Sequence, residues 1–117
     1  AIRDQRREAC HRYLVATNSF YQAVDQVYRK ALRDEEFDAR EHTREAITTL
    51  QDAYVYLTIS TGAAVRELAR AYNRALYALD ESARDADNDS WASLEPETHR
   101  ARDHLRAAMR AELGIAD

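Results

Sequence analysis

The chain has 117 residues, of which 45% are hydrophobic and 32% charged, and it holds two glycines and one proline. This length fits one compact domain, and so few turn-forming residues exclude the many chain reversals of β-sandwiches, doubly wound sheets and glycine-rich phosphate loops. The 22 alanines and 16 arginines favour an all-α protein, and a net charge of −4 does not favour binding to nucleic acid. We therefore expect residues 1–117 to form a single helical-bundle domain.

The first segment carries its inner residues at three positions of each heptad, which predicts a helix over about 1–33. These residues are Cys10, Tyr13, Leu14, Thr17, Phe20, Tyr21, Val24, Val27, Tyr28 and Ala31. The same register places Arg3, Arg6 and Arg7 on this stripe, so the buried part begins near Ala9. The first two turns are therefore expected to overhang the bundle and to face water or a partner.

Two further stripes predict helices over about 37–58 and 62–84. Their inner residues are Thr43, Ala46, Ile47, Leu50, Ala53, Tyr54 and Leu57 in the second helix, and Val65, Leu68, Tyr72, Ala75, Leu76, Leu79 and Ala83 in the third. A fourth helix is predicted over about 96–113, with Pro96 in its first turn and Gly114 as its stop. Two short connections and one long one predict an up-down-up-down antiparallel four-helix bundle.

The long connection, 85–97, is acidic and is predicted to be a loop that Trp91 and Leu94 anchor to the bundle. Its aspartates alternate as the ligands of a calcium loop do. However, Ser90 stands where such a loop needs glycine, and Pro96 stands where it needs the bidentate glutamate. The metal candidates are Asp85, Asp87, Asp89 and Glu95. The alternative is a solvated loop rich in helix-capping residues.

Five tyrosines fall on the predicted inner stripes, where each buried hydroxyl needs a hydrogen-bond partner. They are Tyr13, Tyr21, Tyr28, Tyr54 and Tyr72. One interpretation is a polar pocket for a small ligand. The other is that the hydroxyls bond to polar core residues such as Thr17 and Thr43, or reach water at the edge of the bundle.

The sequence offers no catalytic site. Cys10 occupies a core position, where a thiol is inert, and no serine or cysteine stands at helical spacing from a histidine that shares its helix face. Glu8 and His11 form a single Glu-x-x-His motif, whereas a di-metal bundle needs two such motifs and two more glutamates. We therefore expect no enzyme activity and no cofactor. One cysteine makes no internal disulfide, which favours a reducing, cytoplasmic compartment.

The predicted fourth helix has a basic face. Its members are Arg100, Arg102, Arg106 and Arg110. Arginines four residues apart repel one another, so an acidic surface is expected opposite them, supplied by the 85–97 loop or by the second helix. No aromatic residues interleave with these arginines, and we expect no nucleic acid as a partner.

Four segments resemble a loose group of actinobacterial helical proteins of unknown function. They read DQRREACHRYLVA at 4–16, AYVYLTIS at 53–60, VREL at 65–68 and AAMRAELGI at 107–115. Many members of that group carry a transmembrane helix upstream of a similar arginine-rich segment. The resemblance implies membrane contact through an upstream segment that this sequence lacks, with the bundle on the cytoplasmic face by the positive-inside rule.

Together these observations predict a non-enzymatic helical interaction or sensing module, the cytoplasmic part of a membrane-tethered protein. Its partner is expected to be another protein, or a second copy reached through the first helix. The alternative function is a bundle that binds a small ligand or a metal through the tyrosine-lined interior or the acidic loop.

Overall fold

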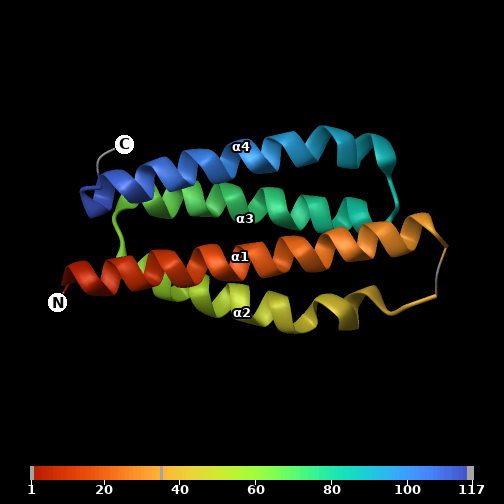
Figure 1. Ribbon diagram of the computed structural model, residues 1–117, viewed down its shortest axis with the longest axis horizontal. Coiled ribbons are helices and arrows are strands. Elements are labelled where there is room, and N and C mark those ends of the chain that lie inside the picture. Colours follow the sequence, from red (N-terminus) through yellow and green to blue (C-terminus); the bar gives the residue numbers. More distant parts are fainter. Residues whose placement is uncertain (1, 35, 116–117) are drawn as a thin grey trace.

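Four helices in up-down-up-down order make up the computed structural model, which describes residues 2–34 and 36–115 (Figure 1). They are α1 (Ile2–Leu32), α2 (Ala39–Ser60), α3 (Ala63–Arg84) and α4 (Asn88–Leu113). No strand occurs in the described part of the chain. The all-α class and the four-helix bundle are therefore confirmed.

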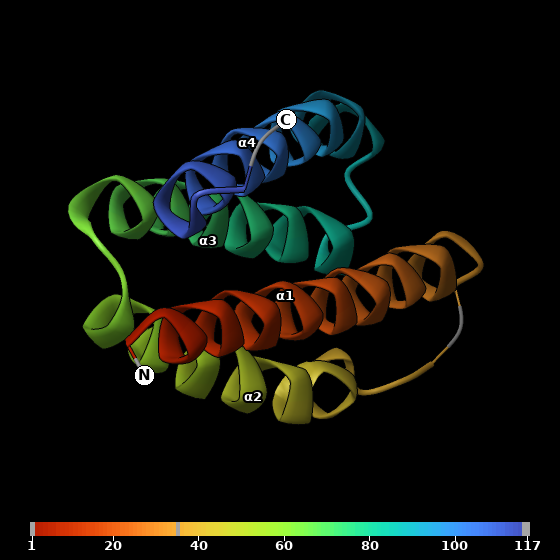
Figure 2. The ribbon, with the colours of Figure 1, turned by 60° about the vertical axis from the view of Figure 1, so that its left-hand side comes forward.

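The bundle is assembled from two helical hairpins. The helices of each hairpin, α1 with α2 and α3 with α4, pack along their length, and the hairpins meet mainly where α1 lies against α3 (Figure 2). Helices α2 and α4 lie on opposite outer sides, and their described residues do not contact one another. Each of these two helices therefore leaves a broad outer face exposed.

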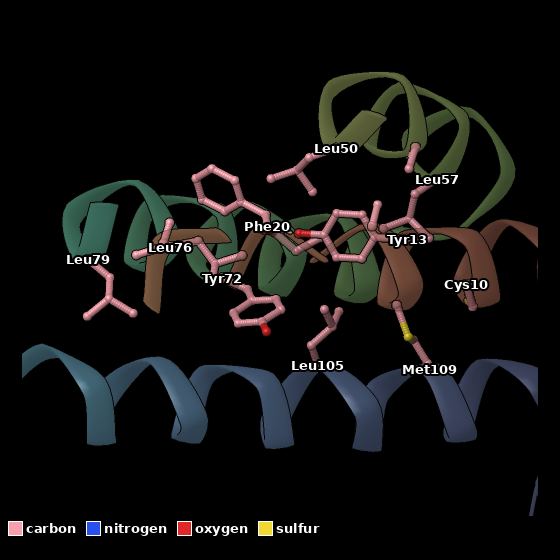
Figure 3. Packing of buried hydrophobic residues seen from close by; sticks show 14 of the residues in the cluster. Cys10, Tyr13, Phe20, Leu50, Leu57, Tyr72, Leu76, Leu79, Leu105 and Met109 are labelled. Atoms are coloured by element: carbon pink, nitrogen blue, oxygen red, sulfur yellow. Dashed lines mark hydrogen bonds between the residues drawn. The ribbon is translucent and has the colours of Figure 1, made fainter. Parts of the chain in front are cut away.

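The predicted inner stripes are the buried ones. In α1 each heptad contributes three residues to the inner stripe. The first two of each three are buried, and the third is half-buried; the half-buried residues are Leu14, Tyr21 and Tyr28. Tyr13 lies at the centre of the core, between Leu50 and Leu57 of α2 and the residues of α3 (Figure 3). Leu105 and Met109 close the core from the side of α4.

Helix α1 is the longest, with 31 residues, and it runs past α2 at both ends (Figure 1). In its first two turns Arg6 is half-buried, and the other described residues before Ala9 are exposed. The overhang nevertheless touches the bundle, because a guanidinium N–H of Arg3 donates to the carbonyl of Leu113 at 3.3 Å. The start of α1 thus lies beside the end of α4.

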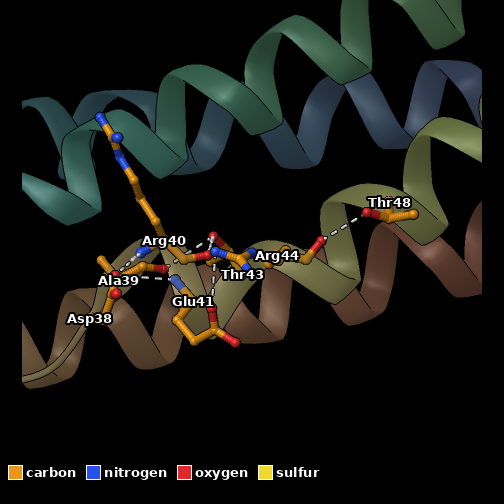
Figure 4. A network of polar contacts seen from close by, with 7 residues as sticks. All are labelled: Asp38, Ala39, Arg40, Glu41, Thr43, Arg44 and Thr48. Carbon is orange, nitrogen blue, oxygen red and sulfur yellow. Dashed lines mark hydrogen bonds and ion pairs between the residues drawn. The ribbon is translucent and has the colours of Figure 1, made fainter.

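The second helix begins at a side-chain cap. The Asp38 carboxylate accepts hydrogen bonds from the backbone N–H groups of Arg40 and Glu41, at 3.1 and 3.2 Å (Figure 4). This contact satisfies two donors that the first turn leaves without helical partners. From the same turn, the Arg40 side chain extends across toward α3 (Figure 4).

The predicted loop over 85–97 and the predicted start of the last helix at Pro96 are both wrong. Helix α4 begins at Asn88, and Pro96 lies inside it. Asp87 is the N-cap: its carboxylate accepts from the Ser90 backbone N–H at 3.1 Å and from the Ser90 hydroxyl at 2.8 Å. This strong cap starts the helix early, and the third turn tolerates a residue that cannot donate a backbone hydrogen bond.

Candidate functional site

The five inner tyrosines do not surround one cavity. Tyr13 is fully buried, and its hydroxyl donates to the carbonyl of Ala69, at 3.1 Å, and to the side-chain oxygen of Asn73. Burial raises the pKa of Tyr13 far above its usual range. Its ring lies near those of Tyr54 and Tyr72, with centroids 6.2 and 6.5 Å away. Tyr13 is therefore a core residue that is inaccessible to a ligand.

Tyr28 and Tyr54 also lie apart from any shared pocket. Tyr28 stacks on Trp91 and donates its hydroxyl proton to Asn88. Tyr54 is half-buried beside the break between α2 and α3, where it lines a surface groove with Arg66 and other residues of both helices. Tyr13, Tyr28 and Tyr54 thus lie in three separate environments.

Tyr21 and Tyr72 are the two tyrosines that share a cavity. It measures about 30 Å³ and lies where α1, α3 and α4 meet. Its lining consists of Leu14, Thr17, Asn18, Tyr21, Tyr72, Thr98, His99, Arg102 and Arg106. We call this space the polar pocket. It is far smaller than the several hundred Å³ of a typical site for an organic ligand, so it admits a single small group.

Most hydroxyl groups that line the polar pocket already donate a hydrogen bond within the chain. Tyr21 donates to the Glu95 carboxylate at 2.7 Å, which with burial raises the pKa of Tyr21. Thr17 donates to the Leu14 carbonyl at 3.0 Å, and Thr98 donates to the Leu94 carbonyl at 2.7 Å. Thr17 and Tyr72 both line the pocket, and Thr17 opposes the rise that burial causes in the pKa of Tyr72. Thr43 instead donates to the carbonyl of Ala39.

Positive charge reaches this pocket from one side of α4. Burial raises the pKa of Tyr72, and the charges of Arg102 and Arg106 oppose that rise. The Nε of Arg102 is buried and makes no hydrogen bond; it lies 3.6 Å from Oδ1 of the exposed Asp103, with which it forms an ion pair. The side chain of His99 stacks obliquely on Tyr21, with ring centroids 5.5 Å apart. The pocket is therefore richer in donors than in acceptors.

The acidic residues of the predicted calcium loop are not brought together. Asp85 ends α3, Asp87 caps α4, Asp89 lies in the first turn of α4, and Glu95 accepts the hydroxyl of Tyr21. Among the described residues, no three histidine, cysteine, aspartate or glutamate side chains are placed to hold a metal ion. Hydrogen bonds from Ser90 lower the pKa of Asp87, as expected for a capping carboxylate.

The cysteine lies where the sequence placed it. Cys10 is buried at 3% exposure, and burial, followed by the nearby charge of Glu112, raises its pKa to about 11. A thiol with so high a pKa is a poor nucleophile at neutral pH. Glu8 and His11 are exposed on the outer side of α1.

A second candidate surface lies on the outside of the α1–α2 hairpin. The segment 53–65 has no charged residue, and within it the side chains of Val55 and Ile59 are 59% and 74% exposed. On α1, Val15 is 51% exposed and lines a groove of about 370 Å³ against α2. We call Val55 and Ile59, which lie one helical turn apart on α2, the outer apolar surface. Large apolar side chains exposed close together on a surface are typical of a protein-binding site.

The sequence predicted the basic face of α4 but not what it faces. The acidic surface opposite is expected from the 85–97 segment or from the second helix, yet most of that segment belongs to α4 itself, and α2 and α4 do not touch in the described part of the chain. Arg102 and Arg106 instead turn toward Asn18 and the tyrosines, whereas Arg100 is exposed. Asn18 falls off the predicted inner stripe, so helical periodicity gave no signal for it.

No helix of the described residues is both long and apolar enough to cross a membrane. Compared with known protein families, curated proteins and solved structures, the chain matches none of them. The function therefore has to be inferred from the two surfaces described above.

Proposed function

We propose that this chain is a non-enzymatic helical interaction or sensing module that works by self-association through the α1–α2 hairpin. The observation that carries the proposal is the exposure of Val55 and Ile59, one helical turn apart, within a segment of 13 residues, 53–65, that has no charge. A helix of a soluble bundle usually places charged residues at such positions. The apolar side chains therefore have a role other than folding this one chain.

A second copy is the partner that best matches this surface. The groove beside Val15 carries one charge of each sign, Arg12 on α1 and Asp52 on α2. In a two-fold symmetric dimer each copy presents both charges, so Arg12 of one copy can approach Asp52 of the other while the apolar side chains pack together. The guanidinium of Arg12 is already held near the surface, 4.7 Å from the ring centre of Tyr56.

A non-enzymatic role is supported by the chemistry of the buried thiol. Cys10 has a raised pKa, and the hydroxyls of Thr17 and Thr98 in the polar pocket donate to backbone carbonyls. Such groups are held by the fold and are not activated as nucleophiles.

We also propose that the bundle lies at the cytoplasmic face of a membrane. The resemblance to tethered actinobacterial proteins supports a bundle at the cytoplasmic face of a membrane, held there by an upstream segment. Arg3, Arg6 and Arg7 at the start of α1 fit this arrangement, since arginines beside a span stay on the cytoplasmic side. Two adjacent tethered copies would approach side by side, as self-association through one hairpin requires.

Sedimentation equilibrium over a range of protein concentrations tests the self-association. The wild-type chain is expected to form dimers, and Ile59→Asp is expected to weaken dimerisation by about tenfold or more, because it puts a charge into an apolar contact. Leu32→Asp is the matched control, since Leu32 is also exposed but lies at the far end of α1. A wild-type chain that stays monomeric throughout, or an equal effect of both variants, contradicts the proposal.

A further inference from the structure

The polar pocket holds polar groups that neither the packing of the core nor the proposed self-association uses. It lies on the opposite side of α1 from the groove beside Val15, between α1, α3 and α4. Burying a charged guanidinium nitrogen without a hydrogen bond is unfavourable, yet the Nε of Arg102 is placed in this way, with only a long ion pair of 3.6 Å to Asp103. A donor in a small polar space that makes no hydrogen bond within the chain is free to donate to a bound group.

The unused donors all point to the same kind of partner. Arg102 and Arg106 contribute two positive charges, while Asn18 and His99 add an amide and a ring nitrogen. The Glu95 carboxylate is not among the lining residues and already accepts the hydroxyl of Tyr21. The nearest acid to Arg102, Asp103, is 67% exposed and contacts it at 3.6 Å, too far for a strong hydrogen bond. The pocket therefore lacks a buried negative charge.

We propose that the polar pocket binds an oxyanion, the carboxylate or phosphate group of a small ligand. The Nε–H of Arg102 and the guanidinium of Arg106 donate to its oxygens, because arginine matches the planar or tetrahedral array of such groups. Asn18 supplies a further donor from α1.

The dimensions of the pocket limit what enters. A cavity of about 30 Å³ holds one small charged group, and the remainder of any ligand stays outside. The Arg102 side chain is 35% exposed and Arg106 is exposed, so the anion enters from solvent along α4. Because the lining comes from three helices, a bound anion joins the two hairpins and stabilises their contact.

Nuclear magnetic resonance of the full chain tests this binding directly. Sodium phosphate and sodium acetate are titrated separately at neutral pH, with sodium chloride keeping the ionic strength constant. The Nε–H resonance of Arg102 and the side-chain amide of Asn18 are expected to shift and saturate with at least one of the two anions. The anion that binds more tightly identifies whether the site takes phosphate or carboxylate groups.

The variants separate specific binding from general attraction to arginine. Arg102→Gln is expected to weaken binding by about tenfold or more, because a charge-assisted hydrogen bond is lost. Arg100→Gln removes the same charge from an exposed position of the same helix and is expected to bind as the wild type does. Circular dichroism checks that each variant folds, and Arg106→Gln replaces Arg102→Gln if the latter does not.

Three outcomes overturn the proposal. They are linear, unsaturable shifts up to tens of millimolar of both anions, equal weakening by Arg100→Gln and Arg102→Gln, and shifts that sodium chloride alone reproduces. Each indicates that the pocket holds water and that the arginines attract anions without a site.

Discussion

Tyr28 and Trp91 lie face to face, with ring centroids 4.1 Å apart and an angle of 5° between the ring planes. The pair joins the last third of α1 to the first turn of α4, two segments that are far apart in the sequence. The Tyr28 hydroxyl adds a hydrogen bond to Asn88, at the first residue of α4. This contact is where the two hairpins are held together at the end opposite the chain termini (Figure 1).

Replacing Trp91 measures how much the stacked pair contributes to the stability of the fold. Trp91 is 7% exposed, so Trp91→Ala is expected to lower the free energy of unfolding by about 3 kcal/mol, through lost burial and the cavity left behind. Urea denaturation followed by circular dichroism measures the change. Trp91→Phe keeps an aromatic ring and is expected to lose less than half as much. Equal stability of Trp91→Ala and the wild type would mean that the stack does not hold the hairpins together.

The same region explains what sequence reasoning missed. Alternating aspartates and a proline within a stretch rich in small polar residues favour a loop, and several neighbouring aspartates could each cap a helix as Asp87 does. The cap is decided by the two hydrogen bonds from Ser90 and by the burial of Trp91 one turn into the helix. Tertiary packing thus outweighed the local preference against Pro96 inside a helix.

A contact between Gly62 and Glu112 closes the other end of the bundle. The backbone N–H of Gly62, the N-cap of α3, donates to Oε1 of Glu112 at 2.6 Å. A Cβ added at Gly62 would lie 2.8 Å from that same oxygen. Any residue can adopt the φ of −81° found at Gly62, so the backbone conformation does not require glycine here. Glycine is needed because the Glu112 carboxylate approaches the backbone so closely.

A double-mutant cycle measures this contact. Gly62→Ala is expected to lower the free energy of unfolding by about 1 kcal/mol, because the added methyl group displaces the carboxylate from the N–H. In a Glu112→Ala background the same change is expected to have little effect, since nothing remains to be displaced. Thermal unfolding of the four proteins gives the coupling, and simple additivity of the two changes would refute the pairing.

Asp80 is the acid that the fold buries most. It is 5% exposed, its Oδ1 has no partner, and its Oδ2 lies 3.7 Å from the guanidinium of Arg84. Burial raises its pKa above the usual 3.8, and the charge of Arg84 opposes that rise. It lines a groove between α2 and α3 that Arg40 and Arg44 also border. The carboxylate is therefore more easily protonated in the folded chain than in the unfolded one.

Because the pKa of Asp80 is raised in the folded chain, the direction in which its contribution to stability changes with pH can be predicted. Between the unfolded and the folded pKa the folded chain binds more protons, so the contribution of Asp80 to stability falls as pH rises through that interval. Asp80→Asn is expected to remove this slope and to raise the free energy of unfolding at pH 7 by up to about 1 kcal/mol. Urea denaturation at several pH values checks this, with Asp103→Asn as the exposed control. A variant less stable than the wild type at pH 7 would show that the pair with Arg84 outweighs the cost of burial.

Much of the fold followed from periodicity alone. Tyr13, Phe20, Leu50 and Leu57 were predicted to face inward and are fully buried, because a heptad pattern fixes one face of a helix. The polar pocket was not predictable in the same way. Its lining residues come from three helices. How these helices are rotated relative to one another depends on the packing between them, and the hydrophobic pattern of one helix does not determine it.

The division into two hairpins also has a kinetic consequence. Most helix contacts join segments that follow one another in the chain, α1 with α2 and α3 with α4. A topology dominated by such local contacts has a low contact order, and small helical proteins of this kind fold within microseconds to milliseconds. Each hairpin can form before the other is complete, so we expect the docking of α1 on α3 to come late. Rapid-mixing experiments would then place Trp91, which reports on the contact between hairpins, among the last groups to reach its final environment.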